Sequence, residues 1–146
     1  MARDEIDSMT QIALFAAFEP AALRTLTLAA ETRLFRAGDV LFRRGEAADC
    51  GFVLTTGSIA LQAHDDGRPA EKIVHSVALI GEIALIAPTL RPATAIAREP
   101  ATALKVTRSL FHYVLERHPA TAARARDLFR ARLAGFAADL SFDPDG

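Results

Sequence analysis

The middle of the chain, residues 32–106, is a series of short apolar segments separated by turn residues. Each segment is about four to six residues long and rich in Val, Ile, Leu, Phe and Thr, which is typical of strands and too short for most helices. Gly-containing turns separate them at residues 37–39, 44–46, 56–57 and 65–67. Short strands at this spacing predict an antiparallel sandwich or roll.

Helical patterns flank this region on both sides. Residues 9–30 carry two apolar clusters, and Pro20 between them suits the first turn of a helix, where a missing N–H costs no hydrogen bond. Thr107 is a candidate cap for a helix over residues 109–117. A last helix is predicted from about residue 120 to 139, with one apolar stripe made of Ala122, Ala125, Phe129, Leu133, Phe136 and Leu140.

These patterns predict one α+β domain over residues 1–146. Its parts are N-terminal helices at 1–31, a β-roll at 32–106 and C-terminal helices at 107–140. The hydrophobic share of 51% and the charged share of 24% are typical of a soluble globular protein. The acidic N-terminus is no signal peptide, and the apolar runs are too short to cross a membrane, so we expect a cytoplasmic protein without a membrane span.

Several function classes are not indicated. A net charge of −1 provides no broad basic surface for nucleic acid, and the final residues SFDPDG are too few and too acidic to begin a DNA-binding module. Cys50 is the single cysteine, which excludes an intrachain disulfide and a cysteine-rich zinc site. The four histidines contain no His-x-His pair, and no serine or cysteine lies in a recognisable nucleophile motif. We therefore expect no enzyme, no metal, no resident cofactor and no direct contact with nucleic acid.

The segment GEIALIAPTLRPATA, residues 81–95, places an acid and a base in an apolar stretch. Gly81 allows a sharp turn, and residues 82–86 can form one helical turn with unpaired N–H groups that suit an anion. Arg91 follows closely enough to pair with the same anion through its guanidinium.

Glu82 cannot bind an anion, but its carboxylate is an acceptor for a sugar hydroxyl. The segment therefore indicates a pocket for a phosphorylated sugar. The alternative is that Glu82 caps its own helical turn and Arg91 pairs with a neighbouring acid such as Glu99.

The same segment resembles the phosphate-binding cassette of cyclic-nucleotide-binding domains, which reads Gly-Glu, three apolar or small residues, a variable loop and Arg-x-Ala-Thr. The stretch LFRAGDVLFRRGEAADCGFVLTTGSIALQ, residues 34–62, resembles the glycine-punctuated strands of that family, and LFAAFEPAALRTL resembles its first helices. The resemblance covers about residues 12–140. It implies an antiparallel, jelly-roll-like β-roll of about eight strands with N-terminal helices, a short helix in the cassette and two C-terminal helices. It also implies a ligand, cAMP or cGMP.

The resemblance further implies roles for individual residues. Glu82 would bind the ribose 2′-hydroxyl, and Arg91 the cyclic phosphate, assisted by N–H groups around Ile83 and Ala84. The full expected set is Gly81, Glu82, Ile83, Ala84, Arg91, Pro92, Ala93 and Thr94. In this family the last helix folds over the base, which makes Arg126, Arg132 and Phe129 candidate base contacts; for each of them the alternative is packing on the roll or self-association.

Two positions depart from the family pattern. A glycine that usually precedes the Gly-Glu pair is replaced by the stretch Ser76-Val77-Ala78. Pro92 follows the arginine and has no N–H for the phosphate, which would weaken binding by about 0.5–3 kcal/mol. Pro92 also lacks the hydroxyl that is often found here in relatives selective for cGMP, and this favours cAMP.

We therefore expect a stand-alone sensor or regulatory module that binds a cyclic nucleotide and signals through its C-terminal helix. The recipient would be an effector protein or a second copy in a homodimer. The competing interpretation is a degenerate β-roll that no longer binds nucleotide and serves in protein–protein interaction or dimerisation. Pro92 and the missing glycine favour the second interpretation, whereas Glu82 and Arg91 favour the first.

Overall fold

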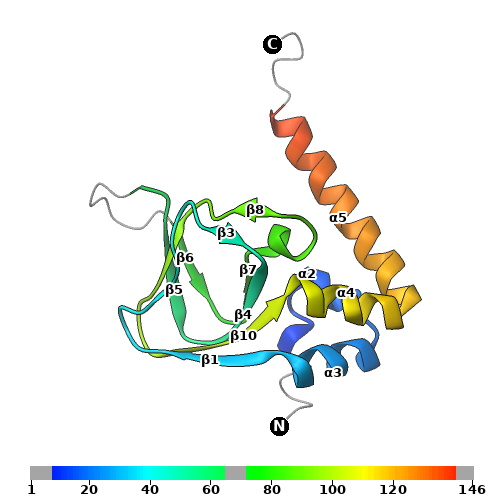
Figure 1. Ribbon diagram of the computed structural model, residues 1–146, viewed down its shortest axis with the longest axis horizontal. Coiled ribbons are helices and arrows are strands. Elements are labelled where there is room, and N and C mark those ends of the chain that lie inside the picture. Colours follow the sequence, from blue (N-terminus) through cyan, green and yellow to red (C-terminus); the bar gives the residue numbers. More distant parts are fainter. Residues whose placement is uncertain (1–7, 65–71, 141–146) are drawn as a thin grey trace.

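The computed structural model describes residues 8–64 and 72–140, with side chains through residue 131 (Figure 1). The helices are α2 (Ala13–Ala16), α3 (Pro20–Ala29), the 3₁₀ helix η1 (Glu82–Leu85), α4 (Arg108–Arg117) and α5 (Pro119–Leu140). The strands are β1 (Glu31–Phe35), β2 (Val40–Phe42), β3 (Ala47–Ala48), β4 (Cys50–Thr56), β5 (Ser58–Gln62), β6 (Lys72–His75), β7 (Ala78–Ile80), β8 (Thr89–Leu90), β9 (Thr94–Ala97) and β10 (Ala101–Thr107). The hairpin tip expected at residues 65–67 lies outside the described residues, as do the side chains of Leu133, Phe136 and Leu140.

The strands form two four-stranded antiparallel sheets, in the orders β1-β10-β4-β7 and β2-β9-β5-β6, and a two-stranded sheet β3-β8. The predicted α+β fold with an antiparallel β-roll is confirmed. The turn expected at residues 56–57 joins β4 to β5, with Gly57 at φ 92°. The strands β3, β7 and β8 were not expected as separate elements, because two or three residues are too few to show a period of two.

Two hydrophobic cores fill the molecule, and β4 contributes to both. Phe52 and Leu54 on one face of β4 pack inside the roll with Phe42 and Ile59. Val53 on the other face packs in a second core between the sheet and the helices. Successive residues of a strand point to opposite faces, so burial of both faces accounts for the continuous apolar run in this strand.

The helices begin and end where local chemistry favours it. α3 begins at Pro20, as predicted, and the Thr107 side chain caps α4 by accepting a hydrogen bond from the backbone N–H of Leu110 at 3.0 Å. α4 ends at Arg117 because His118 precedes Pro119 and is pushed out of the helical conformation.

The first turns of α5 are fixed to the N-terminal part of the chain. The buried Thr121 accepts a hydrogen bond from the backbone N–H of Glu19 at 3.0 Å, and Arg124 donates to the carbonyl of Ala17 at 2.7 Å. From there α5 runs past the side of the molecule on which η1 lies, and its C-terminal end points away from the sheets (Figure 1). Within the described residues, no helix combines the length and the apolar character needed to cross a bilayer.

Candidate ligand-binding site

The predicted cassette begins at the junction of β7 and η1. Gly81 ends the extended backbone in the left-handed conformation, with φ 83° and ψ 38°, and η1 follows at once. The carbonyl of Gly81 accepts a hydrogen bond from the N–H of Ala84 at 3.2 Å. Ala84 and Leu85 are buried, whereas Ile83 is 41% exposed. The helical turn expected over residues 82–86 is thus present, anchored by its apolar side.

Arg91 is the single basic residue of this segment and is buried, with 6% of its surface exposed. Its backbone N–H donates to the carbonyl of Glu46 at 2.8 Å, and its own carbonyl accepts from Gly45 at 2.8 Å. Its Nη2 donates to the carbonyl of Cys50 at 2.9 Å and contacts Cys50 Sγ at 3.3 Å. The guanidinium also lies over the Phe42 ring, 4.1 Å from its centroid.

Among the described residues, the contacts of Arg91 provide no negative charge, because a carbonyl and an aromatic ring are uncharged. Cys50 is uncharged as well: burial raises the pKa of its thiol, although the nearby positive charge of Arg91 acts in the opposite direction. A buried cation among uncharged neighbours favours the entry of an anion. The expected alternative partner, Glu99, accepts a hydrogen bond from the Ser58 hydroxyl at 2.6 Å.

Gly81 brings the two ends of the segment together. A Cβ atom at residue 81 would lie 2.6 Å from Nη1 of Arg91, so the guanidinium rests directly on the glycine. Glu82 follows Gly81 in the chain and is half-buried. Gly81 and Arg91, which are ten positions apart in sequence, are therefore neighbours in space. Arg91 thus lies near the start of the helical turn, as its predicted pairing with an anion there requires.

A cavity of about 520 Å³ lies beside Glu82 at the open edge of the roll. Its walls come from β5, β6 and β7 and from the cassette: Leu61, Lys72, Ile73, Val74, His75, Ala78, Leu79, Ile80, Gly81 and Glu82. The walls are mainly apolar, and Glu82, Lys72 and His75 provide polar groups, a combination typical of small-molecule sites.

The remaining cassette residues lie on the return to β9. Pro92 is exposed and Ala93 is half-buried. Thr94 is 8% exposed, and its hydroxyl accepts a hydrogen bond from the N–H of Arg44 at 3.0 Å, which fixes the turn that precedes β3. In the stretch Ser76-Val77-Ala78 that replaces the family glycine, Ser76 and Val77 form the short link between β6 and β7, and Ala78 begins β7.

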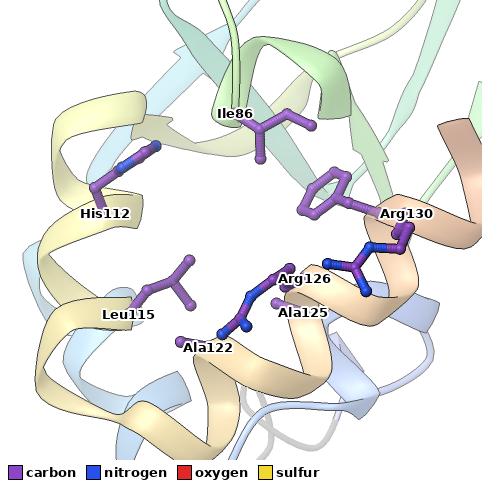
Figure 2. Close-up of a pocket in the computed structure, with 8 residues that line it drawn as sticks. Ile86, His112, Leu115, Ala122, Ala125, Arg126 and Arg130 are labelled. Carbon is purple, nitrogen blue, oxygen red and sulfur yellow. The ribbon is translucent and has the colours of Figure 1, made fainter.

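The expected base contacts on α5 do not gather at this cavity. Phe129 is 5% exposed and packs edge-on against Phe111, with ring centroids 6.1 Å apart. Arg126 lines a different space, between α4, α5 and the end of η1 (Figure 2). In this structure Phe129 packs in the helical core, which was the alternative to contact with the base. Arg132 lies in α5 beyond the described side chains.

Arg108 is a residue that the sequence patterns missed. Its side chain donates to the carbonyls of Ala84 and Ala48, both at 2.8 Å, and to that of Ala87 at 3.2 Å. It therefore ties the cassette to the first residue of α4. The available signal was a base at the start of a helix, where the helix dipole disfavours positive charge.

Within the described residues, no group of three or more His, Cys, Asp or Glu side chains is placed to hold a metal ion. The chemistry that the site offers is thus recognition by one guanidinium, one carboxylate and backbone N–H groups.

One known domain family matches the part of the chain that contains the β-roll and the cassette. The sequence model described as the cyclic nucleotide-binding domain matches residues 32–118. The structure of a cyclic nucleotide-binding-like protein from Brucella abortus is 39% identical, with a TM-score of 0.71 over 77% of this chain and 98% of that one. The N-terminal domain of a transcriptional regulator from Streptomyces coelicolor A3(2) is 27% identical, with a TM-score of 0.79 over 91% and 94% of the two chains.

A more distant structure shares the fold alone. The regulatory domain of Toxoplasma gondii PKA, co-crystallised with cAMP, is 22% identical, with a TM-score of 0.70 over 77% of this chain and 44% of that one. A search of curated proteins found no match.

Proposed function

The chain belongs to the cyclic nucleotide-binding domain family, and we propose that it is a sensor or regulatory module whose ligand is a cyclic nucleotide, with cAMP preferred over cGMP. The observation that carries the proposal is the buried guanidinium of Arg91, which rests on Gly81 among uncharged neighbours. A regulatory binding domain needs no catalytic group, and we propose none.

The cyclic phosphate is the part of the ligand that suits Arg91. The Nη2 atom of Arg91 is held by the Cys50 carbonyl, and Nη1 lies at Gly81, where the backbone turns into η1. The first N–H groups of a helix have no partner within it, so those of Glu82 and Ile83 can assist the guanidinium. A phosphate there would receive charge-assisted hydrogen bonds and neutralise the buried cation.

The ribose suits Glu82. A carboxylate accepts hydrogen bonds and repels phosphate, so Glu82 can orient the ligand with its 2′-hydroxyl toward η1 and its phosphate toward Arg91. In that orientation the base would lie in the cavity beside Glu82, against the apolar side chains of β5, β6 and β7. Its volume of about 520 Å³ is within the usual range for sites that enclose small ligands.

The preference for cAMP rests on Pro92. Its side chain has no hydroxyl to meet a guanine, and its nitrogen has no proton to donate. Pro92 is exposed beside the buried arginine, a position from which a residue with a hydroxyl could reach a bound ligand.

The signal that ligand has bound passes from the cassette to α4 and then to α5. Arg108 joins the carbonyls of the cassette to α4, and α4 packs against α5 through Phe111 and Phe129. A shift of η1 on ligand binding would therefore change the position of α4 and, through it, that of α5. An effector protein or a second copy that contacts α5 would respond to this shift in population.

The second candidate is an interaction module that does not bind nucleotide. The observation in its favour is that Arg91 already bonds to Cys50 and stacks on Phe42, which gives the guanidinium a structural role. Calorimetric titration of the wild type with cAMP and then cGMP separates the two. Saturable binding of cAMP that is tighter than that of cGMP supports the sensor, whereas no heat with either nucleotide supports the interaction module.

A further inference from the structure

A groove of about 690 Å³ lies between the end of η1 and helices α4 and α5. Figure 2 shows Ile86 entering from the cassette side, His112 and Leu115 from α4, and Ala122, Ala125, Arg126 and Arg130 from α5. Phe129 completes the lining. The floor is thus apolar, and the polar groups are confined to three side chains that are exposed at its rim.

This groove is separate from the cavity assigned to the nucleotide. The two share no lining residue among those described. Glu82 lies at the first position of η1, and Ile86 follows the last, so they occupy opposite ends of the helix. A molecule in the groove would leave the cavity beside Glu82 open.

The rim is positively charged. Arg126 and Arg130 are four residues apart, so they project from the same face of α5. Arg130 Nη1 is 4.0 Å from Asp127 Oδ1, but both side chains are more than 70% exposed, and such a pair contributes little. No hydrogen bond or ion pair joins Arg126 to another residue in the described part of the chain. Both guanidinium groups are thus available to an anion.

We propose that the groove is a second ligand site and that it takes a small amphipathic anion, an acyl chain or similar apolar body that carries a carboxylate or a phosphate. The apolar walls bury the body, and the two arginines bind the head through charge-assisted hydrogen bonds. The groove volume is within the roughly 300–1,000 Å³ that is usual for small-ligand sites. Among the residues with described side chains, eight line the groove, far fewer than the roughly 20–30 on each side of a stable protein–protein interface. The proposal does not depend on nucleotide binding.

The test uses decanoate as the probe, below its micelle concentration, with decan-1-ol as the uncharged probe of equal chain length. Calorimetric titration measures affinity, and amide shifts in ¹H–¹⁵N NMR spectra locate the site. The variant is Arg126→Gln/Arg130→Gln, and the matched control is Arg24→Gln/Arg98→Gln, which removes the same charge from two exposed side chains elsewhere. All of these substitutions are at exposed positions, so the fold should be kept, as circular dichroism can check.

The expected result is saturable binding of decanoate by the wild type and the control, with shifts centred on Leu115, Ala122 and Ala125. Affinity should fall at least about tenfold in the groove variant, because charge-assisted hydrogen bonds are lost. Three outcomes would overturn the proposal: no saturable binding by the wild type, equal affinity for decanoate and decan-1-ol, or shifts centred on the strands beside Glu82. Because the titration contains no nucleotide, failure here leaves the proposed cyclic-nucleotide site untouched.

Discussion

The guanidinium of Arg91 occupies the space that a side chain at residue 81 would need, with Nη1 2.6 Å from the position of a Cβ atom on Gly81. Gly81 also has φ 83°, a conformation that L side chains rarely adopt. Glycine at this position therefore serves two purposes: it turns the chain into η1 and admits the arginine to the turn. The site depends on this contact, since it places the phosphate-binding group beside the start of the helix.

Gly81→Ala should abolish binding of cAMP, because the new methyl group displaces the guanidinium. It should also destabilise the fold by about 1–2 kcal/mol through the left-handed backbone. Gly38→Ala is the matched control, since Gly38 has φ 92° but open space around a Cβ atom. Urea unfolding should show a loss for both variants, larger for Gly81→Ala because the displaced guanidinium also loses its hydrogen bond to Cys50, and calorimetry should show cAMP binding only by Gly38→Ala. Unchanged cAMP affinity in folded Gly81→Ala would contradict this account.

Glu82→Gln should weaken binding of cAMP by about tenfold, because a carboxylate accepts a hydroxyl proton more strongly than an amide does. The wild type should lose a similar factor when 2′-deoxy-cAMP replaces cAMP. If Glu82 binds the 2′-hydroxyl, the variant should no longer distinguish the two nucleotides. Calorimetric titration of both proteins with both ligands measures this coupling. Additive losses would show that Glu82 acts on another part of the ligand.

Arg108→Gln should lose about 2 kcal/mol or more of unfolding free energy, since hydrogen bonds from a charged donor to three carbonyls are removed. It should also uncouple the cassette from the helices. Hydrogen exchange should show that cAMP alters protection of α4 and the first turns of α5 in the wild type but much less in the variant. Arg117→Gln, an exposed change on the same helix, is the control. A full response of α4 in folded Arg108→Gln would argue for another route.

Cys50 should make stability fall at high pH. Burial raises the pKa of its thiol in the folded state, so the folded form holds the proton more tightly than the unfolded chain, whose thiol has a pKa of about 8.5. The stabilisation that the Cys50 thiol gives to the folded state is therefore complete at pH values below the pKa of the unfolded chain. It is lost as pH rises through the higher pKa of the folded state. Urea unfolding at pH 7.5 and at pH 9.5 (about one unit either side of that value) should show a larger loss for the wild type than for Cys50→Ser. Parallel losses in the two proteins would rule out this role.

Local sequence patterns predicted those features that local chemistry determines. Glycine turns and short apolar segments indicated the β-roll, Thr107 and Pro20 marked helix starts, and the segment 81–95 indicated a helical turn after Gly81. These features depend on neighbours in the chain, which a sequence displays directly.

The rest depends on contacts that only the topology creates. Arg91 is held by Cys50, 41 residues away, and Arg108 reaches Ala48, 60 residues away. Nothing local to Cys50 indicates that its carbonyl holds an arginine. Phe129 was a candidate base contact with packing as the alternative, because the apolar stripe of a helix shows only that one face is buried and not what it meets. In this structure Phe129 packs against Phe111.

The central claim is that Arg91 binds the phosphate of a cyclic nucleotide, and calorimetric titration of Arg91→Gln with cAMP tests it most directly. Glutamine removes the charge and keeps a polar side chain, and the exposed Arg98→Gln is the control for charge alone. Urea unfolding first establishes that each variant is folded. We predict that the wild type and Arg98→Gln bind cAMP with equal affinity and that Arg91→Gln loses at least about tenfold. Equal affinity of folded Arg91→Gln and the wild type, or no binding of cAMP by the wild type, would contradict the claim.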